Sequence, residues 1–558
     1  MRWRWEEIEP FYQELSDRSI DAGNVDGWLR DWSHLSRLIY ERFQRIEVAV
    51  TVDTTDRDAE KQYTDFLDEI FPRAQAMEQK LKEKLLESGL QPKGFEIPLR
   101  NMRAEADLFR AENLPLISEE MKVGTEYDKI AGAQTVEWEG QELTIPQIAP
   151  LMQKSDRSQR EQLWRLAMKR QIQDRQTVNE LWIKLLNLRF QLARNADKPD
   201  YRAYRWQELL RLDYTPEDTL RFHEAIEQVV VPAAQRVYER NRQRLGVDEL
   251  RPWDLFQDLY PLYQPPLPSY GSVDNLIETT GRIFYQVDPK LGEYFQTMRD
   301  EGLLDLPNRK NKAPGGYCTD FPVAQRPFIF MNAVGVHDDI QTLLHEGGHA
   351  FHVFESNHLP YFQQQQVGSE FSEVASMGME LLAGPYLGRE HGGFYEPREA
   401  ARARIQHLEQ NLLFWPYMSV VDSFQHWVYT HPEEAVDPAR CDACWGELWD
   451  RFITGVNWDG LEEEKVTGWH RKLHIFRYPF YYIEYGLAQL GAMQVWANAL
   501  QDQRSAVATY RRALSLGGTV PLPQLFQAAG AKLAFDAETL SKSVQLAEQT
   551  IEELEQFL

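Results

Sequence analysis

The sequence contains little cysteine and no long apolar run. Its 558 residues include three cysteines, Cys318, Cys441 and Cys444, which are too few and odd in number for a disulfide framework. No apolar run reaches the length of about 18 residues that a membrane-spanning helix needs. The segment after Met1 also lacks the apolar stretch of a signal peptide. We therefore expect a cytoplasmic protein with no membrane partner.

Positive charge is also in deficit. Lysine and arginine number 61 against 86 aspartates and glutamates, which gives a formal charge of −25. Such a charge disfavours nucleic acid and anionic membranes as partners and favours solubility. A hydrophobic content of 43% and an aromatic content of 12% favour a packed globule over a disordered chain. A chain of this length usually divides into more than one lobe.

The most informative segment is the H-E-x-x-H pattern formed by His345, Glu346 and His349. Histidines four residues apart lie on one face of a helix, about 6 Å apart along its axis. Both can therefore reach one metal ion, at about 2.0–2.1 Å for zinc. Glu346 points to the side and is placed to accept a proton from the attacking water. Gly347 and Gly348 each cost roughly 1 kcal/mol in a helix, which indicates that another element closely approaches the backbone there.

A third metal ligand is expected on the helix-like segment that follows. Catalytic zinc usually has three protein ligands and one open position. Glu370, Glu373 and Glu380 fall on one face of this segment, between apolar residues. Buried carboxylates need partners, which a metal ion or a ligand histidine can supply. We predict Glu373 as the third ligand, with Glu370 and Glu380 orienting the histidines.

At these residues the sequence resembles the thimet oligopeptidase and oligoendopeptidase F family of zinc metallopeptidases, most closely the oligoendopeptidase F branch. In that family an H-E-x-G-H helix is followed by a helix whose Glu, in an E-x-x-S context, completes the metal site. Gly348, Glu373 and Ser376 match this pattern. The resemblance is convincing from about residue 200 to the C-terminus. It extends to three further stretches: Pro314–Cys318, Pro327–Asn332 and His474–Tyr485.

The resemblance implies one zinc ion per chain and identifies candidate hydrogen-bond donors in the His- and Tyr-rich stretch. A developing oxyanion needs donors that do not ionise at neutral pH, and a tyrosine hydroxyl meets this need. Tyr485 and Tyr478 are therefore predicted to donate to the substrate or transition state, with His474 beside them. We expect Tyr481 and Tyr482 to pack or to support these groups.

Substrate binding is expected beside the metal helix. Residues 328–334 have the β-branched and aromatic content of a strand. If this strand lies at a sheet edge, it can hold an extended peptide by main-chain hydrogen bonds. Gly315 and Gly316 permit close backbone approach, and Tyr317 would then face the cleft.

The predicted fold class is mainly α. Residues 135–145 are expected to form a hairpin around Gly140, and residues 158–195 a long helix opened by a capping box from Ser158 to Glu161. We predict an N-terminal helical region, 1–195, that contributes to a channel wall, and a catalytic helical region, 196–558, with the zinc site. The resemblance implies a zincin-type peptidase with two lobes, a deep central channel and a short β-sheet beside the zinc helix.

These features predict a zinc-dependent endopeptidase that hydrolyses internal bonds of short oligopeptides. One alternative is a metallocarboxypeptidase or dipeptidase on a similar scaffold. It would need a cation for the terminal carboxylate of the substrate, and Arg471, Lys472 and Arg477 are candidates. Another alternative is an inactive peptide-binding protein, although such a protein has no need of Glu346. Two histidines and a carboxylate would also bind cobalt or manganese. The sequence leaves the oligomeric state open.

Overall fold

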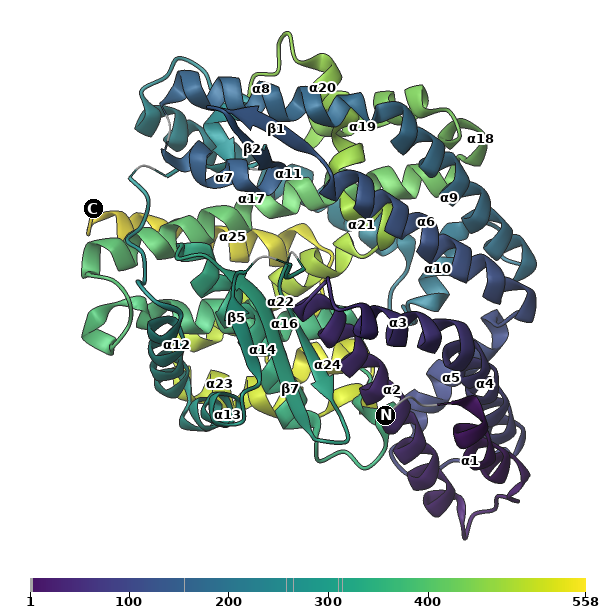
Figure 1. Ribbon diagram of the computed structural model, residues 1–558. Helices are drawn as coiled ribbons and strands as arrows, with labels where there is room; N and C mark the ends of the chain where they lie inside the picture. The colour runs from purple at the N-terminus through teal and green to yellow at the C-terminus, as the bar shows by residue number, and fades with distance from the viewer. Residues whose placement is uncertain (1–3, 155, 257, 264, 310, 314) are drawn as a thin grey trace.

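The computed structural model describes residues 4–558 except 155, 257, 264, 310 and 314. Within these residues the chain is mainly helical, with a few short strands, so the predicted fold class is confirmed (Figure 1). Among the helices that they form, none combines the length and apolar content needed to cross a lipid bilayer.

The N-terminal helices have a hydrophobic core of their own. Trp28 and Trp32 are fully buried at its centre, and Tyr361, from much later in the chain, joins it. The helices of this region are α1 (Trp5–Asp17), α2 (Val25–Val52), α3 (Arg57–Asp65), α4 (Phe71–Glu87) and α5 (Glu96–Leu108). In Figure 1 these helices are purple; α1, α4 and α5 lie at the lower right, while α2 runs back toward the strand at 317–321, where Thr51 contacts Tyr317. The division at residue 195 stays a prediction.

The following segment contains the predicted hairpin, with Thr135 paired to Thr144 across the turn. The predicted helix over 158–195 is wrong in two respects. It is broken at Asp174, whose carboxylate accepts hydrogen bonds from Gln134 and Arg170, and its N-cap is Asp156. The elements here are α6 (Leu114–Gly132), β1 (Thr135–Trp138), β2 (Gln141–Thr144), α7 (Ile145–Lys154), α8 (Arg157–Gln173), α9 (Arg175–Asn195) and α10 (Tyr201–Glu208).

A three-stranded sheet precedes the metal helix. Its order is β5 (Leu304–Pro307), β7 (Arg326–Ala333), β6 (Tyr317–Phe321), with β5 parallel and β6 antiparallel to β7. The strand predicted at 328–334 is therefore the central strand, and its proposed role as a sheet edge is wrong. The edge strands are β5 and β6, of which β6 packs on the metal helix. The chain leaves β7 and enters α14 (His337–Ser356), which packs on β6 and β7 (Figure 1).

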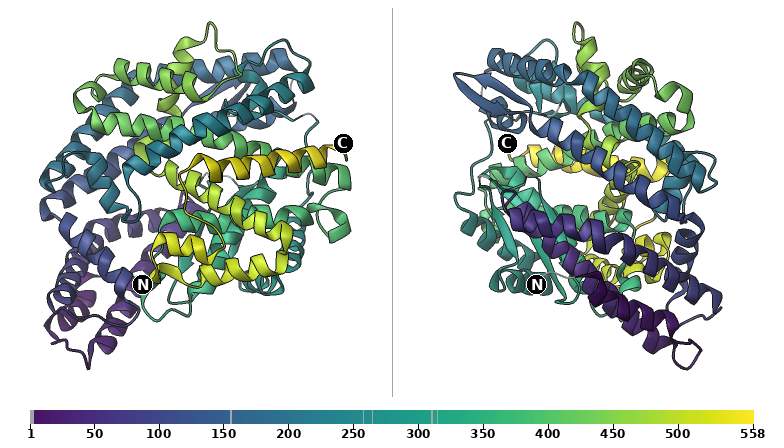
Figure 2. Two further views of the ribbon diagram at one scale, coloured as in Figure 1. Left: turned by 180° about the vertical axis from the view of Figure 1, so that it is seen from behind. Right: turned by 45° about the vertical axis from the view of Figure 1, so that its right-hand side comes forward.

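The remaining helices surround this unit. The helix α16 (Ser369–Ala383) lies between α14 and α22 (Tyr482–Gln501). The long helix α17 (Pro397–Thr430) packs on both α11 (Pro216–Leu245) and α25 (Ala537–Glu555), which also contact each other. Figure 2 shows α25, in yellow, crossing beside α11 and α17. The other elements are β3 (Leu255–Phe256), β4 (Tyr260–Pro261), α12 (Val273–Val287), α13 (Pro289–Asp300), α15 (Phe362–Gln365), α18 (Pro432–Ala435), α19 (Pro438–Phe452), α20 (Glu462–Val466), α21 (Leu473–Arg477), α23 (Gln503–Leu514) and α24 (Leu522–Ala528).

Candidate metal and catalytic site

The start of α14 is fixed by a buried carboxylate. Asp339 accepts hydrogen bonds from the backbone N–H groups of Val334, Gly335 and Val336, at 2.7–3.0 Å. The hydroxyl of Tyr270 donates a further bond of 2.7 Å to the same carboxylate. A carboxylate at this end of a helix satisfies free N–H groups and suits the helix dipole. The position of the histidines on α14 is therefore anchored to the end of β7.

The two glycines of the motif allow neighbouring elements to touch α14. A Cβ atom at Gly348 would lie 2.5 Å from the Cα of Ser376 and closer still to the carbonyl oxygen of Ala375. A Cβ at Gly347 would collide with the ring of Phe284. The predicted close approach is thus observed. The backbone of α16 lies against α14 because Gly348 has no side chain.

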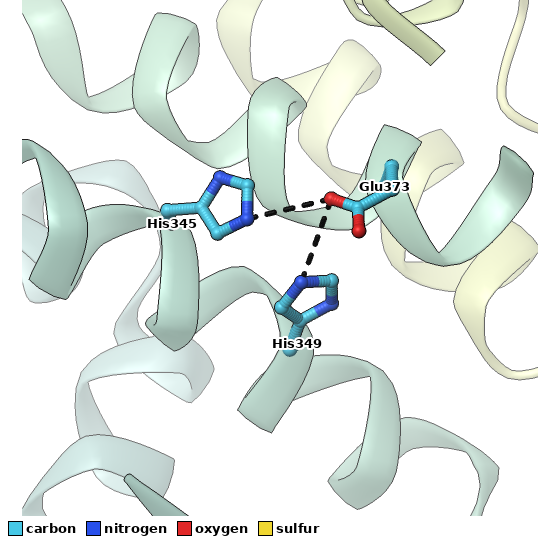
Figure 3. Close-up of side chains that lie close together, drawn as sticks. All are labelled: His345, His349 and Glu373. Atoms are coloured by element: carbon cyan, nitrogen blue, oxygen red, sulfur yellow. Dashed lines mark ion pairs between the residues drawn. The ribbon is translucent and has the colours of Figure 1, made fainter. Parts of the chain in front are cut away.

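This contact brings three side chains together. The Nε2 atoms of His345 and His349 lie 3.4 and 3.6 Å from Oε2 of Glu373 (Figure 3). One potential ligand atom from each residue lies within 4.8 Å of the other two. Two imidazoles and a carboxylate are the donor set of many catalytic zinc sites. Their role as ligands stays a proposal, developed below.

The protonation of two of these groups suits a cation. Burial opposes ionisation of Glu373, but His349 and His345 outweigh it and lower its pKa to about 2. Burial lowers the pKa of His349 to about 4. At neutral pH the carboxylate is therefore ionised and this imidazole neutral, which are the forms that bind metals. The residues present fit a divalent metal ion.

A second layer of hydrogen bonds orients the three side chains. His345 Nδ1 donates to Glu380 at 2.7 Å, and His407 Nε2 donates to the other oxygen of Glu380 at 2.8 Å. Ser376 and Tyr481 donate to Glu373, each at 3.0 Å. Such bonds fix which ring nitrogen is free for a metal. Glu380 thus has the predicted contact with a histidine.

Glu370 does not have the role predicted for it. Its carboxylate accepts a bond of 2.6 Å from Tyr214 and lies 3.6 Å from Arg211, so it belongs to a separate buried ion pair. Sequence reasoning also missed His407. This histidine lies 27 residues beyond Glu380, on α17, and no local pattern links the two.

Glu346 lies buried beside the three residues. Burial raises the pKa of its carboxyl to about 7, although His345 and a backbone hydrogen bond from Cys318 favour the ionised form. A group with a pKa near the working pH can both accept and release a proton. Because Cys318 belongs to β6, this edge strand of the sheet lies beside the Glu346 carboxyl.

The His- and Tyr-rich stretch spans α21 and the start of α22. The ring of Tyr485 lies 5.1 Å from that of Tyr481 and 6.1 Å from that of His474. Burial and the nearby Glu373 raise the pKa of Tyr485, so its hydroxyl stays protonated. Burial lowers the pKa of His474 to about 3, and its Nδ1 has no partner among the described residues. Tyr478, 44% exposed, lies beside His474.

The glycine-rich stretch leads into β6. Pro314 lies outside the described residues. Gly315 has φ of +97°, a conformation that favours glycine, and its carbonyl accepts a bond from Asn332. Gly316 is exposed, with Thr342 of α14 close to its backbone. The Tyr317 hydroxyl lies 2.6 Å from the Thr51 hydroxyl, and its ring stacks on a β7 side chain.

A helix bearing H-E-x-x-H, packed on a helix with a third donor and on a sheet edge, is typical of metal-dependent hydrolases. Comparison with known proteins agrees. The family model "Peptidase family M3" matches residues 150–545, and "Peptidase M3 N-terminal domain" matches residues 1–96. The chain belongs to peptidase family M3, which implies a bound metal ion. The resemblance found in the sequence is confirmed.

Individual relatives are similar over different lengths. Oligopeptidase PepF of Bacillus subtilis is 23% identical over 338 residues, which are 59% of this chain and 48% of that protein. Oligopeptidase A of Escherichia coli is 26% identical over 280 residues, which are 40% of this chain and 41% of that protein. The chain thus matches less than half the length of each of these two relatives.

Solved structures match along the whole chain. A protein designated oligoendopeptidase F has a TM-score of 0.90 with 27% identity, covering 99% of this chain and 97% of that one. PZ peptidase A, solved with an inhibitor, has a TM-score of 0.90 with 26% identity, and the match covers 99% of this chain and 98% of that one. The fold described above is therefore that of oligopeptidases of known structure.

Proposed function

We propose that the protein is a zinc-dependent endopeptidase that hydrolyses internal bonds of short oligopeptides. One zinc ion per chain would be held by His345, His349 and Glu373. The observation that carries the proposal is the position of Glu346, a buried carboxyl beside these three residues and at the sheet edge. Membership in family M3 and the names of the similar oligopeptidases support it.

Each residue of the site has its own role in the proposed hydrolysis. A zinc ion in this site would act as a Lewis acid and make water a stronger acid. Glu346 accepts a proton from the attacking water and passes it to the leaving amine nitrogen. A pKa of about 7 suits both transfers. Glu380 holds His345 in one orientation, so that Nε2 remains free.

The tyrosines and β6 act on the peptide itself. Tyr485 and Tyr478 donate hydrogen bonds to the oxyanion or the substrate, with His474 beside them. Of the two tyrosines, Tyr485 has the stronger support, because it lies among the buried groups near Glu373 and Glu346. An extended peptide adds to the free edge of β6 by main-chain hydrogen bonds.

The glycine-rich residues that precede β6 lie next to the proposed peptide-binding edge. The exposed backbone of Gly315 and Gly316 would flank the bound peptide, with Tyr317 behind it. In this proposal residues 1–195 contribute to the wall of a deep channel between two lobes, and residues 196–558 carry the zinc site. A narrow channel would admit flexible oligopeptides and exclude folded proteins.

We also propose a cytoplasmic location and no nucleic acid or membrane partner. The three cysteines are free thiols, which suits a reducing compartment. The formal charge of −25 opposes binding to polyanions.

The test is to map the products formed from a mixed peptide library by mass spectrometry, with and without a chelator. The proposal expects chelator-sensitive cuts at internal bonds of short peptides, restored by zinc. Removal of only one or two residues from C-termini would replace it with the exopeptidase alternative. Binding without any cleavage would favour an inactive peptide-binding protein.

A further inference from the structure

A cavity of about 400 Å³ lies beside the His- and Tyr-rich stretch, outside the set of residues assigned above. Its wall is formed by α7, α8, α19 and the β3–β4 hairpin, together with Tyr482 of α22. Most of this wall is apolar, and it includes Met152, Trp164 and Trp449. An apolar cavity with a few polar groups is the usual form of a site for a small ligand or a side chain.

One cation of the wall, Lys472, has no anionic partner. Its Nζ lies 4.4 Å from the ring centre of Tyr482 and 5.3 Å from that of Tyr417. No hydrogen bond or ion pair joins this ammonium to any residue that the structure describes. Aromatic faces attract a cation but do not satisfy its N–H groups. Burial lowers the pKa of Lys472 to about 7, as expected for a cation that lacks a counter-charge.

The neighbouring charged groups are already paired. Arg471 donates to Asp258 at 3.3 Å and to the carbonyl of Glu464 at 3.1 Å. The same Asp258 accepts a bond of 2.7 Å from Trp164. Arg477, farther along the chain, donates to Asp128. Of the three cations that the sequence offered for a substrate carboxylate, Lys472 is thus the one without an acidic partner among the described residues.

Other polar atoms of the wall also lack partners. The indole nitrogens of Trp445 and Trp449 have no acceptor among the described residues, and the amide oxygen of Gln171 has no donor. An amide can present either its oxygen or its nitrogen after a flip. These atoms are themselves buried and have almost no accessible surface, so the inference rests on Lys472.

The cavity is close to the catalytic residues. The ring of Tyr482, which forms part of the wall, lies 4.8 Å from that of His474 and 5.8 Å from that of Tyr485. Lys472 Nζ therefore lies within about 10 Å of the Tyr485 ring, the length of roughly three extended residues. This distance is short enough for a peptide bound beside Tyr485 to reach Lys472 with a carboxylate no more than about three residues away.

We propose that this cavity is a specificity subsite, in which Lys472 binds a carboxylate of the peptide substrate within about three residues of the group beside Tyr485. The carboxylate is either the C-terminus of a short peptide or an acidic side chain. The inference rests on the proposed peptidase function, and it adds to that function a preference for peptides with a negative charge at this position. Lys472 binds substrate here and takes no part in bond cleavage.

The test compares three versions of one peptide: with a free C-terminal carboxylate, with a C-terminal amide, and as the amide with glutamate placed at successive positions. A charge-assisted hydrogen bond predicts that one carboxylate form is cleaved with kcat/KM about 10- to 100-fold above the plain amide. Preference for the free acid identifies the C-terminus, and rescue of the amide by glutamate identifies a side chain. Equal rates for all forms in the wild type overturn the inference without any variant.

Two variants attribute the preference to Lys472. Lys472→Met retains most of the apolar stem and removes the charge. It should reduce the ratio of kcat/KM for the carboxylate form to kcat/KM for the plain amide to about one. Lys169→Met removes an exposed lysine of the nearby α8 and should leave the preference intact. A preference that survives in Lys472→Met overturns the assignment, provided that the thermal unfolding of the variant shows a folded protein.

A binding measurement separates this inference from the proposed function. Calorimetry with the Glu346→Gln variant measures the affinities of the acid and amide peptides without turnover. A preference for the acid in binding supports the subsite even if the wild type cleaves neither peptide, a result that would refute only the peptidase function. Equal affinities, together with cleavage by the wild type, refute the subsite alone.

Discussion

Gly348 of α14 and Ser376 of α16 are packed so closely that a Cβ on the glycine would lie 2.5 Å from the Cα of the serine. The two helices that carry His345, His349 and Glu373 meet at this point. The atoms that such a Cβ would meet belong to the backbone of α16, so they cannot rotate away as a side chain would. The separation of the two helices, and so of the three side chains, depends on the absence of a side chain at Gly348.

The first prediction concerns this contact. Gly348→Ala should force the helices apart, at a cost of about 1–3 kcal/mol for overpacking, and should weaken zinc binding. Unfolding in urea and competition with a chelator measure the two effects. Gly27→Ala, at an exposed helical glycine with nothing within 4 Å of the added atom, should leave both unchanged or raise stability slightly. Wild-type zinc affinity in Gly348→Ala would contradict the argument.

The second prediction concerns the carboxylate behind the first histidine. Glu380→Gln keeps the shape of the side chain but weakens its hydrogen bonds with His345 and His407. It should lower zinc affinity about 10- to 100-fold. Glu370→Gln, on the same helix, is the matched control, because Glu370 contacts Tyr214 and Arg211 instead. It can change the unfolding transition but should leave zinc affinity as it is. Equal loss of affinity in both variants would count against a specific role for Glu380.

The third prediction separates metal binding from proton transfer. Glu346→Gln should retain one zinc ion per chain and lose at least about 10²-fold in kcat, because the amide cannot accept the proton. Elemental analysis gives the zinc content, and cleavage of a peptide gives kcat. A zinc-loaded variant with wild-type turnover would refute the proposed role of this carboxyl.

The fourth prediction concerns the tyrosine donors. Tyr485→Phe removes one hydroxyl and should lower kcat by roughly 10²–10³-fold if that hydroxyl donates to the oxyanion. Its KM should change much less, since the donor acts mainly in the transition state. Tyr285→Phe, at an exposed position of α12, provides the control for loss of a hydroxyl. Unchanged turnover in Tyr485→Phe would assign Tyr485 to packing.

The fifth prediction concerns acid stability. Burial, with Arg175 and Arg471 nearby, lowers the pKa of His470 from 6.5 to about 3. Between these values the unfolded chain binds a proton that the folded protein does not, so stability falls as the pH falls, by about 1.4 kcal/mol per pH unit for this one group. Above pH 6.5 both forms are neutral and the effect vanishes.

Between pH 6.5 and 4.5, His470→Gln should therefore reduce the slope of unfolding free energy against pH by about 1.4 kcal/mol per pH unit, the contribution of one proton. The glutamine amide can still donate to Asn179, the present partner of the ring. His34→Gln, at an exposed position of α2, serves as the control. Identical slopes in the wild type and His470→Gln would contradict the prediction.

Local patterns predicted the parts of the site that lie within one element. His345, Glu346 and His349 share a helix turn, so their relative directions follow from 3.6 residues per turn. The hairpin at Gly140 is also local, because its two strands are joined by a two-residue turn. The break at Asp174 has no such local signal; its carboxylate accepts hydrogen bonds from Arg170 and from Gln134, which comes from another part of the chain.

Contacts between distant segments were beyond such patterns. Two carboxylates on one face of α16, Glu370 and Glu380, look alike in sequence. Only the packing of α17 and α14 gives Glu380 its histidines, while Arg211 and Tyr214 engage Glu370. The order of strands in a sheet is likewise a long-range property, so the residue pattern of 328–334 does not reveal that β7 is central and that β5 and β6 form the edges.

Residues that are close in the chain specify the helical character, the motif and, through it, the family, because helix geometry and the choice of ligand residues are encoded within a few turns of chain. Three features come only from long-range packing: the carboxylate that supports His345, the strand edge beside Glu346, and the cavity in which Lys472 has no counter-charge among the described residues. Each of these depends on side chains from elements far apart in the sequence. Their distances are set by how the cores pack, which no local periodicity specifies.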